Sequence, residues 1–184
     1  MIYPIYIYGS PVLREEAKDI AKDFPELKAL VEDMFETMYA AEGVGLAAPQ
    51  IGKAIRMFVV DVSGFAKHDP KAAGYKRVFI NPEIYEESEE DILMNEGCLS
   101  VPGIHEDVYR PESIRIRYFD EDFVEHDEEI DGWRARAVQH EYDHIEGIVF
   151  TDHLSPLRRT LLKSKLGSMS KGKFDAAYRT KLTK

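Results

Sequence analysis

The segment with the clearest capacity for chemistry is QHEYDHIEGIVF, residues 139–150. It places His140 and His144 four residues apart, with Glu141 directly after the first histidine. On an α-helix, residues four apart share one face, so both imidazoles can bind one metal ion. A carboxylate beside them can take a proton from a water molecule on that ion. The pattern predicts a metal site with a general base, provided that a further ligand lies elsewhere.

The third ligand decides the class of site, and the chain after His144 offers few candidates. No glutamate follows Glu146, so the downstream glutamate ligand of thermolysin-type peptidases is absent. The metzincin pattern H-E-x-x-H-x-x-G-x-x-H needs a histidine where this chain has Phe150. Spacing alone leaves Asp152 and Asp175 open as ligands. Ordinary metallopeptidase assignments therefore lose most of their support.

The upstream candidate is Cys98, the only cysteine of the chain, in the segment NEGCLSVPG. A thiolate is a strong ligand for zinc and for other borderline-soft divalent metals. Glycines flank the segment, and such a tight stretch can turn its backbone N–H groups toward a ligand. One thiolate and two imidazoles leave a fourth position for water, as in catalytic rather than structural sites. Cys98, His140 and His144 are therefore the predicted metal ligands.

A further segment, EGVGLAAPQIG at residues 42–52, follows the first predicted helix. Its glycines lack the spacing of a dinucleotide-binding loop and no predicted strand leads into them, which argues against phosphate binding. Glycines also let the backbone approach a peptide-like substrate closely. Gln50, near the end of the segment, has an amide N–H that can stabilise a developing oxyanion.

The helices and strands that must position these residues follow from the periodicity of apolar side chains. Residues 25–41 carry apolar positions at helical spacing, and residues 132–147, which contain the histidines, form a second helix candidate between two glycines. Strands are predicted at 56–62 and 78–82, and a hairpin over 113–131. Strands and helices without regular alternation indicate an α+β fold.

A basic helical segment is predicted at the C-terminus over residues 155–184, with its helix beginning at Ser155 and Pro156. Its inner side is expected to carry five apolar residues: Leu157, Leu161, Leu162, Leu166 and Met169. The chain from Gly147 to its end has nine Lys and Arg against two Asp, so this part carries +7 and the rest −17 of the total of −10. A basic helix of this kind is most simply a solvated one, and a docking surface is the alternative.

Length and composition are those of a globular protein with one domain, residues 1–184. No apolar run approaches a membrane span, and the apolar start lacks the basic flank and cleavage site of a signal peptide. The single cysteine excludes an internal disulfide and fits a reducing compartment, so the expected location is the cytoplasm. The net charge of −10 argues against DNA binding. The acidity gathers at 86–92 and 120–131, which we interpret as solvated hairpins.

In order along the chain, these segments resemble the peptide deformylase family. The pattern of that family is G-x-G-L-A-A-x-Q, then E-G-C-L-S, then Q-H-E-x-D-H-L-x-G. The chain carries GVGLAAPQ at 43–50, EGCLS at 96–100 and QHEYDHIEG at 139–147. The one departure is Ile145 in place of leucine, a volume-conserving change that should leave the metal undisturbed.

The resemblance implies that Cys98, His140 and His144 hold one divalent metal ion and that Glu141 is the general base and acid. Spacing alone allows zinc, iron, cobalt or nickel. The family implies ferrous iron as the working metal, with Zn²⁺, Ni²⁺ or Co²⁺ able to substitute. A ferrous thiolate is sensitive to oxygen, so Cys98 would be a weak point as well as a ligand.

The resemblance also implies a reaction, the hydrolysis of the N-formyl group from the initiator methionine of newly synthesised proteins, with release of formate. Gln50 and the backbone N–H of Leu99 would stabilise the oxyanion, and the backbone of Gly45 would help to bind the substrate. The fold implied is an α+β domain in which mixed or antiparallel sheets surround a central metal-binding helix, with a further helix at the C-terminus.

Four apolar residues are candidates for the pocket that takes the methionine side chain: Val44, Met94, Leu99 and Val138. The implied partners are N-formylmethionyl nascent peptides and, through the basic segment 155–184, the ribosome. No membrane or DNA partner is expected.

Two other functions fit the residues. A metallopeptidase of unusual ligation would cleave internal peptide bonds and would stay active after Cys98→Ala. A non-catalytic metal-binding module would close its site with a fourth ligand, for which the candidates are His105, His126 and His153.

Overall fold

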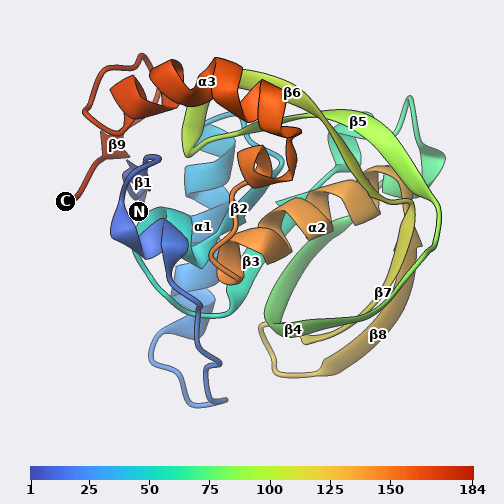
Figure 1. The fold of residues 1–184 in the computed structure, drawn as a ribbon. Coiled ribbons are helices and arrows are strands. Elements are labelled where there is room, and N and C mark those ends of the chain that lie inside the picture. The colour runs from blue at the N-terminus through green and yellow to red at the C-terminus, as the bar shows by residue number, and fades with distance from the viewer.

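Helix α2, which carries the histidine pair, lies in the middle of the computed structural model, with strands on several sides of it (Figure 1). The structure describes residues 1–184. Its α-helices are α1 (Leu27–Ala40), α2 (Gly132–Ile145) and α3 (Pro156–Met169). Its strands are β1 (Ile5–Tyr6), β2 (Gly45–Ala47), β3 (Met57–Asp61), β4 (Lys76–Glu87), β5 (Asp91–Cys98), β6 (Val101–Pro111), β7 (Ser113–Phe119), β8 (Glu125–Asp131) and β9 (Thr180–Lys181).

The largest sheet has five antiparallel strands in the order β2-β3-β4-β7-β8. Strand β3 shows that both faces of this sheet are buried. Met57 and Val59 join the core cluster of α1, whereas Phe58 and Val60 join the cluster of α2. Because side chains alternate between the faces of a strand, a continuous apolar run fits a strand that is covered on both sides. One face of the sheet thus packs against α2 and fixes its position.

The second sheet is the long antiparallel hairpin of β5 and β6. Its register shifts after Gly97, so that Cys98 pairs with Val101 at the tight end of the hairpin. These two strands are not predicted from the sequence, because their exposed face carries many charged residues and the apolar alternation is weak. The hairpin brings Cys98 from a distant part of the chain to the side of α2.

Helix α3 packs on the core through its second half only. Leu166 and Met169 are buried, and Leu162 packs against the same cluster. Leu157 and Leu161 are 68% and 62% exposed, so the prediction that all five apolar residues face inward is wrong for these two. The core cluster beneath α3 does not extend to the first turns of the helix, so nothing covers their side chains.

The chain beyond α3 is not helical, in contrast to the helical segment predicted over 155–184. The helix ends at Met169, and the chain turns back to form β9, which pairs in parallel with β1. The N- and C-terminal segments therefore lie side by side (Figure 1). Ile5 and Ile7 of the apolar N-terminal segment are buried in the core.

The architecture is an α+β fold of one domain with antiparallel sheets around α2, which confirms the predicted fold class. Helix α1 and the hairpin of β7 and β8 fall where apolar periodicity predicts them. Strand β4 continues well past the predicted 78–82, because two register shifts let it follow β7 around the twisted sheet. None of the three helices combines the length and the hydropathy that a membrane crossing requires.

Candidate metal centre

Three side chains meet between α2 and the tight end of the β5–β6 hairpin. The ligand atoms of Cys98, His140 and His144 all lie within 4.8 Å of one another. Cys98 Sγ lies 3.3 Å from Nε2 of His144. No other group of three His, Cys, Asp or Glu side chains in the chain has this geometry. The structure therefore brings together the three residues that the sequence singles out as ligands.

The two histidines converge because they lie one helical turn apart on the same face of α2. Their ring centroids are 5.2 Å apart and their planes make an angle of 73°. The helix stops soon after His144, and Gly147 follows with φ = 74°. A Cβ at Gly147 would lie 2.7 Å from the carbonyl oxygen of Arg14, so only glycine fits this turn.

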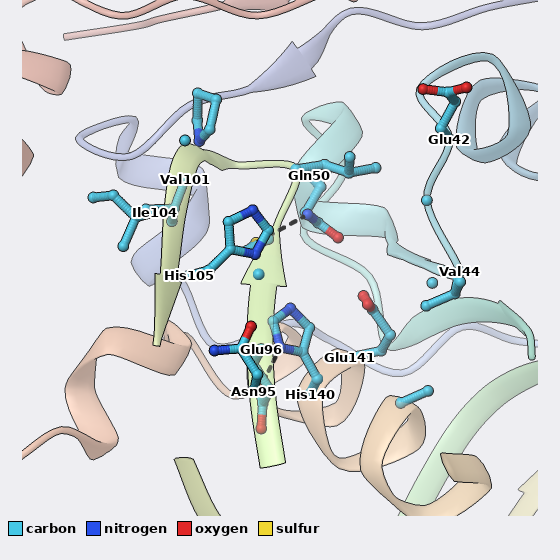
Figure 2. A pocket seen from close by; sticks show the side chains of 18 of the residues that line it. Glu42, Val44, Gln50, Asn95, Glu96, Val101, Ile104, His105, His140 and Glu141 are labelled. Carbon is cyan, nitrogen blue, oxygen red and sulfur yellow. Dashed lines mark hydrogen bonds and ion pairs between the residues drawn. The ribbon is translucent and has the colours of Figure 1, made fainter. Parts of the chain in front are cut away.

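Glu96 orients His140 from the opposite side of the ring. Its Oε1 lies 2.9 Å from His140 Nδ1, which leaves Nε2 to face Cys98 and His144. Such a carboxylate fixes the tautomer of a ligating histidine and increases its basicity. In Figure 2 the dashed contact joins Glu96 to His140 below the cavity.

Two arginines hold Glu96 in turn. Arg110 Nε and Nη2 donate to its two oxygens at 2.7 and 3.0 Å, and Arg136 Nη1 donates at 2.7 Å. Burial favours the neutral acid, but the hydrogen bonds of His140 and Arg110 outweigh it and hold the pKa of Glu96 well below its usual value. Arg110 also pairs with Asp143 at 2.7 Å. The carboxylate thus stays charged in a buried position, where removal of any partner is costly.

Electrostatics favours the thiolate form of Cys98. Burial raises the pKa of the thiol, but the positive charge of His144 and the hydrogen bonds of both histidines lower it to about 5. The Ser100 backbone N–H also donates to Sγ, at 3.4 Å. A metal ligand must be deprotonated, so this setting suits a ligating sulfur.

Glu141 lies beside the ligands as a buried and incompletely paired carboxylate. It is 4% exposed, and its Oε2 has no hydrogen-bond partner within the chain. Burial raises its pKa to about 7, although the charges of His140 and His144 act in the opposite direction. A buried carboxylate without partners is destabilising, and such groups gather where a reaction uses them. The geometry fits the predicted role of general base.

The side-chain amide of Gln50 has a fixed orientation. Its Oε1 accepts the Ala47 N–H at 2.8 Å, so its Nε2 turns toward the centre. Nε2 lies 3.1 Å from Ser100 Oγ and 3.7 Å from Cys98 Sγ. The donor is thus directed to the space beside the ligands, where an oxyanion would need it.

A cavity of about 490 Å³ opens directly on these residues (Figure 2). Its lining includes Gly45, Gln50 and Leu99 together with His140 and Glu141. The carboxylate of Glu141 points into the cavity in Figure 2. The concave shape and the mixed apolar and polar lining of the cavity are those of a substrate site.

The predicted methionine pocket is only partly supported. Val44 and Leu99 line the cavity, but Met94 and Val138 do not. Val138 lies on the side of α2 that faces the five-stranded sheet, and its side chain is fully buried in the core there. Met94 lies two residues before Glu96 on β5, outside the lining. The prediction is wrong for these two residues.

The candidates for a fourth protein ligand lie elsewhere. His126 pairs with Asp120 at 2.8 Å, and His153 with Asp143 at 2.6 Å. His105 lines the cavity and packs against Gly97, where a Cβ would lie 2.6 Å from its ring. None of the three histidines joins the ligand group. The site is therefore open on the cavity side, unlike the closed site of a non-catalytic module.

Both aspartates that spacing left open as ligands are also outside the group. Asp152 binds Arg14, with 2.6 Å between Oδ2 and Nη1. Asp175 lies in the cavity lining without joining the ligand group.

Sequence reasoning missed the ion pairs behind the ligands. The motif EGCLS contains Glu96 but gives it no ion-pair partner, and no motif includes Arg110 or Arg136. One signal was available: Arg136 stands four residues before His140, on the same face of a predicted helix. A buried cation at that position requires a nearby carboxylate. No such signal pointed to Tyr178, which lies 79 positions from Leu99 in sequence and contacts it in the fold.

The residues fit a divalent metal ion of the iron-to-zinc type. One thiolate and two imidazoles form a ligand set of intermediate softness. The site also contains a buried, unpaired Glu141 oxygen that needs a proton or a polar partner. Both features are those of a catalytic metal site with an open position.

Comparisons with known proteins agree with this geometry. The sequence pattern of the polypeptide deformylase family matches residues 2–160. The peptide deformylase of Cytophaga hutchinsonii is 55% identical over 181 residues, which cover 98% of this chain and 97% of that protein. The peptide deformylase of Christiangramia forsetii is 50% identical over 186 residues, with 97% and 95% covered. The crystal structure of the Thermus thermophilus enzyme superimposes with a TM-score of 0.81 at 42% identity, covering 93% of this chain and 97% of that one.

Proposed function

The chain belongs to the polypeptide deformylase family and is a hydrolase that removes the N-formyl group from newly synthesised peptides, and from this premise we propose that Cys98, His140 and His144 hold its metal ion. The observation that carries the proposal is the approach of their three ligand atoms to within 4.8 Å of one another. Two further observations support the same assignment: Glu96 lies within hydrogen-bond distance of His140, and the thiolate form of Cys98 is favoured.

The proposed working metal is Fe²⁺, with Zn²⁺, Ni²⁺ or Co²⁺ able to substitute. A ligand set of one sulfur and two nitrogens accepts all four ions. The likeness to the family favours iron among them. Loss of activity in air, with oxidation of Cys98, is the behaviour expected of an iron-thiolate site.

A divalent metal ion held by Cys98, His140 and His144 would lower the pKa of a water molecule and polarise a carbonyl oxygen. Glu141 accepts the proton of the attacking water, since its carboxylate is buried with one oxygen unpaired. Because the carboxylate is buried beside the reaction site, the same group can return that proton to the leaving amine. Glu141 thus acts first as base and then as acid.

The oxygen of the formyl group gains negative charge during the attack, and two donors are proposed to stabilise it. One is Nε2 of Gln50, whose direction is set by the Ala47 N–H. The other is the backbone N–H of Leu99, which lies in the turn after Cys98. Fixed donors of this kind stabilise the transition state without rearranging. The backbone of Gly45 and the side chains of Val44 and Leu99 would contact the substrate, since all three line the cavity.

The test is formate release from formyl-Met-Ala-Ser by anaerobically prepared, iron-loaded protein. Wild type and His126→Ala, a control at a histidine outside the site, should release formate at equal rates. Glu141→Ala and Cys98→Ala should release almost none. Full activity of Cys98→Ala, or cleavage of internal peptide bonds by that variant, would refute the ligand assignment.

The basic C-terminal segment is proposed to contact the ribosome, and the protein is proposed to act in the cytoplasm where nascent peptides emerge. The first turns of α3 carry the exposed Leu157 and Leu161 next to Arg159 and Lys163, neither of which has an ion-pair partner in the chain. An exposed surface of apolar and basic side chains suits a partner rich in phosphate.

Co-sedimentation with ribosomes measures this contact. The double variant Arg159→Glu, Lys163→Glu should no longer co-sediment with ribosomes at low salt. Its formate release from a tripeptide should be unchanged, because both residues lie outside the cavity. Lys28→Glu is the control for a change in net charge elsewhere on the surface, because Lys28 lies on α1, where it pairs with Asp122. Equal sedimentation of wild type and the double variant would rule out this surface.

A further inference from the structure

The segment after α3 returns to the active site, although it lies beyond the residues that match the family pattern. Residues 175–178 line the cavity. The residues that follow them are fixed by pairing with the β1 segment: Ile5 N–H donates to Arg179 O and Ile7 N–H to Lys181 O, each at 2.9 Å. The end of the chain is therefore a built part of the cavity wall.

Tyr178 makes the most specific contact of this segment. Its hydroxyl donates to the carbonyl oxygen of Leu99 at 2.6 Å. Its ring packs against the core cluster of α1, so the side chain is anchored at both ends. Burial and the nearby Cys98 raise the pKa of Tyr178 to about 12, which keeps the hydroxyl protonated at neutral pH.

The Leu99 carbonyl belongs to the same peptide group as the Ser100 N–H, which donates to Cys98 Sγ at 3.4 Å. In a trans peptide the C=O and the N–H point in opposite directions, and the chain has no cis peptide bonds. A hydrogen bond that fixes the carbonyl therefore also fixes the direction of the N–H. The next carbonyl, of Ser100, accepts the Tyr8 N–H at 2.8 Å.

We propose that Tyr178 is a positioning residue for the metal centre, which holds the Leu99–Ser100 peptide so that its N–H stays directed at the Cys98 sulfur. This inference rests on the proposed role of Cys98 as a metal ligand. A hydrogen bond to a ligating sulfur withdraws electron density from it and tunes the metal, as polar partners of metal ligands do in general. The same peptide follows the Leu99 N–H, so its position also affects the proposed oxyanion donor.

Tyr178→Phe removes only the hydroxyl and keeps the ring in its place. The matched control is Tyr109→Phe on β6, because Tyr109 is 66% exposed. With formyl-Met-Ala-Ser, Tyr178→Phe should lower kcat by about three- to tenfold, the effect of one lost hydrogen bond. KM should change by less than about twofold, since no substrate contact is removed. Tyr109→Phe should match wild type in both constants.

The second readout is the absorption spectrum of the cobalt-substituted protein, which reports on the sulfur directly. Loss of the aligned N–H donor raises the energy of the sulfur lone pairs, so the sulfur-to-cobalt band of Tyr178→Phe should move to longer wavelength. A defect confined to packing would leave this band in place. Unchanged kcat together with an unchanged band would overturn the proposal.

Cys98→Ser tests the ligand role of Cys98 separately from the role of Tyr178. If it removes the sulfur-to-cobalt band of the wild type, the ligand assignment holds and the behaviour of Tyr178→Phe judges Tyr178 alone. If the wild-type protein binds cobalt with no such band, both the ligand role of Cys98 and the inference built on it are wrong.

Discussion

Gly45 and Glu141 approach so closely that no side chain fits between them. A Cβ at position 45 would lie 2.5 Å from Oε1 of Glu141 and 2.8 Å from its carboxyl carbon. Strand β2 therefore sets the position of Glu141, the proposed general base, and glycine at position 45 is a requirement of packing as well as of the proposed access for the substrate. This contact joins the glycine motif to the histidine motif in space.

Gly45→Ala should reduce kcat/KM by about 100-fold, since a shift of about 1 Å in a catalytic group has effects of that order. The carboxylate must move or β2 must bend. Formate release measures the loss. Gly64→Ala is the matched control because nothing lies within 4 Å of a Cβ at that position. Equal activity of the two variants would show that Glu141 has room to adapt.

Gln50→Ala should lower kcat by about 100- to 1000-fold with little change in KM, as expected for a donor that acts in the transition state. Steady-state kinetics with formyl-Met-Ala-Ser separates the two constants. A higher KM with an unchanged kcat would instead assign Gln50 to substrate binding.

Glu96→Gln should destabilise the fold by about 3 to 5 kcal/mol, because it leaves the buried Arg136 without an ion-pair partner and leaves Arg110 paired with Asp143 alone. Urea unfolding of the metal-free proteins measures the difference. Glu106→Gln is the control: its partner Arg158 lies half exposed, and a pair of that kind contributes about 1 kcal/mol or less. Similar losses of unfolding free energy in Glu96→Gln and Glu106→Gln would show that burial of the ion pair does not determine its contribution to stability.

The stability of the metal-free wild type should fall in acid more steeply than that of Glu96→Gln. The pKa of Glu96 is lowered in the folded state, so its contribution is complete above its usual pKa of about 4.3 and is lost as the pH falls toward the folded value. Arg110, Arg136 and His140 are the charged groups that face it. Unfolding free energies at pH 7 and pH 4 should therefore differ more for the wild type. Parallel pH profiles would contradict this linkage.

Removal of the metal with a chelator should abolish formate release and lower the Tm, while the circular dichroism stays that of a folded protein. A ligand that binds only the folded state adds about 4 kcal/mol at a thousand times its dissociation constant. The three core clusters do not include His140 or His144, the proposed histidine ligands, so we expect them to hold the fold without the metal. Restored activity after addition of Fe²⁺ is the expected result. Unfolding of the metal-free protein would show a structural role for the metal.

Much of the site was visible in the sequence because helical spacing is a local property. His140 and His144 share a face of any helix that contains them, and Glu141 follows the first histidine. The helix itself is predicted by its flanking glycines. The fold class, and the position of α1 and of the β7–β8 hairpin, likewise depend on short-range patterns of apolar residues.

The tertiary structure alone decided which distant groups meet. The register shift of the β5–β6 hairpin brings Cys98 to α2, and Glu96 reaches His140 across that interface. Tyr178 contacts Leu99 only because the chain reverses after α3 and pairs with β1. Met94 and Val138 were misassigned for the same reason: whether an apolar residue faces a cavity or the core depends on packing partners that sequence spacing does not specify. The residue types and the local spacing thus determined which side chains are candidate ligands, whereas long-range packing determined whether they meet, which charged groups pair with them and the shape of the cavity.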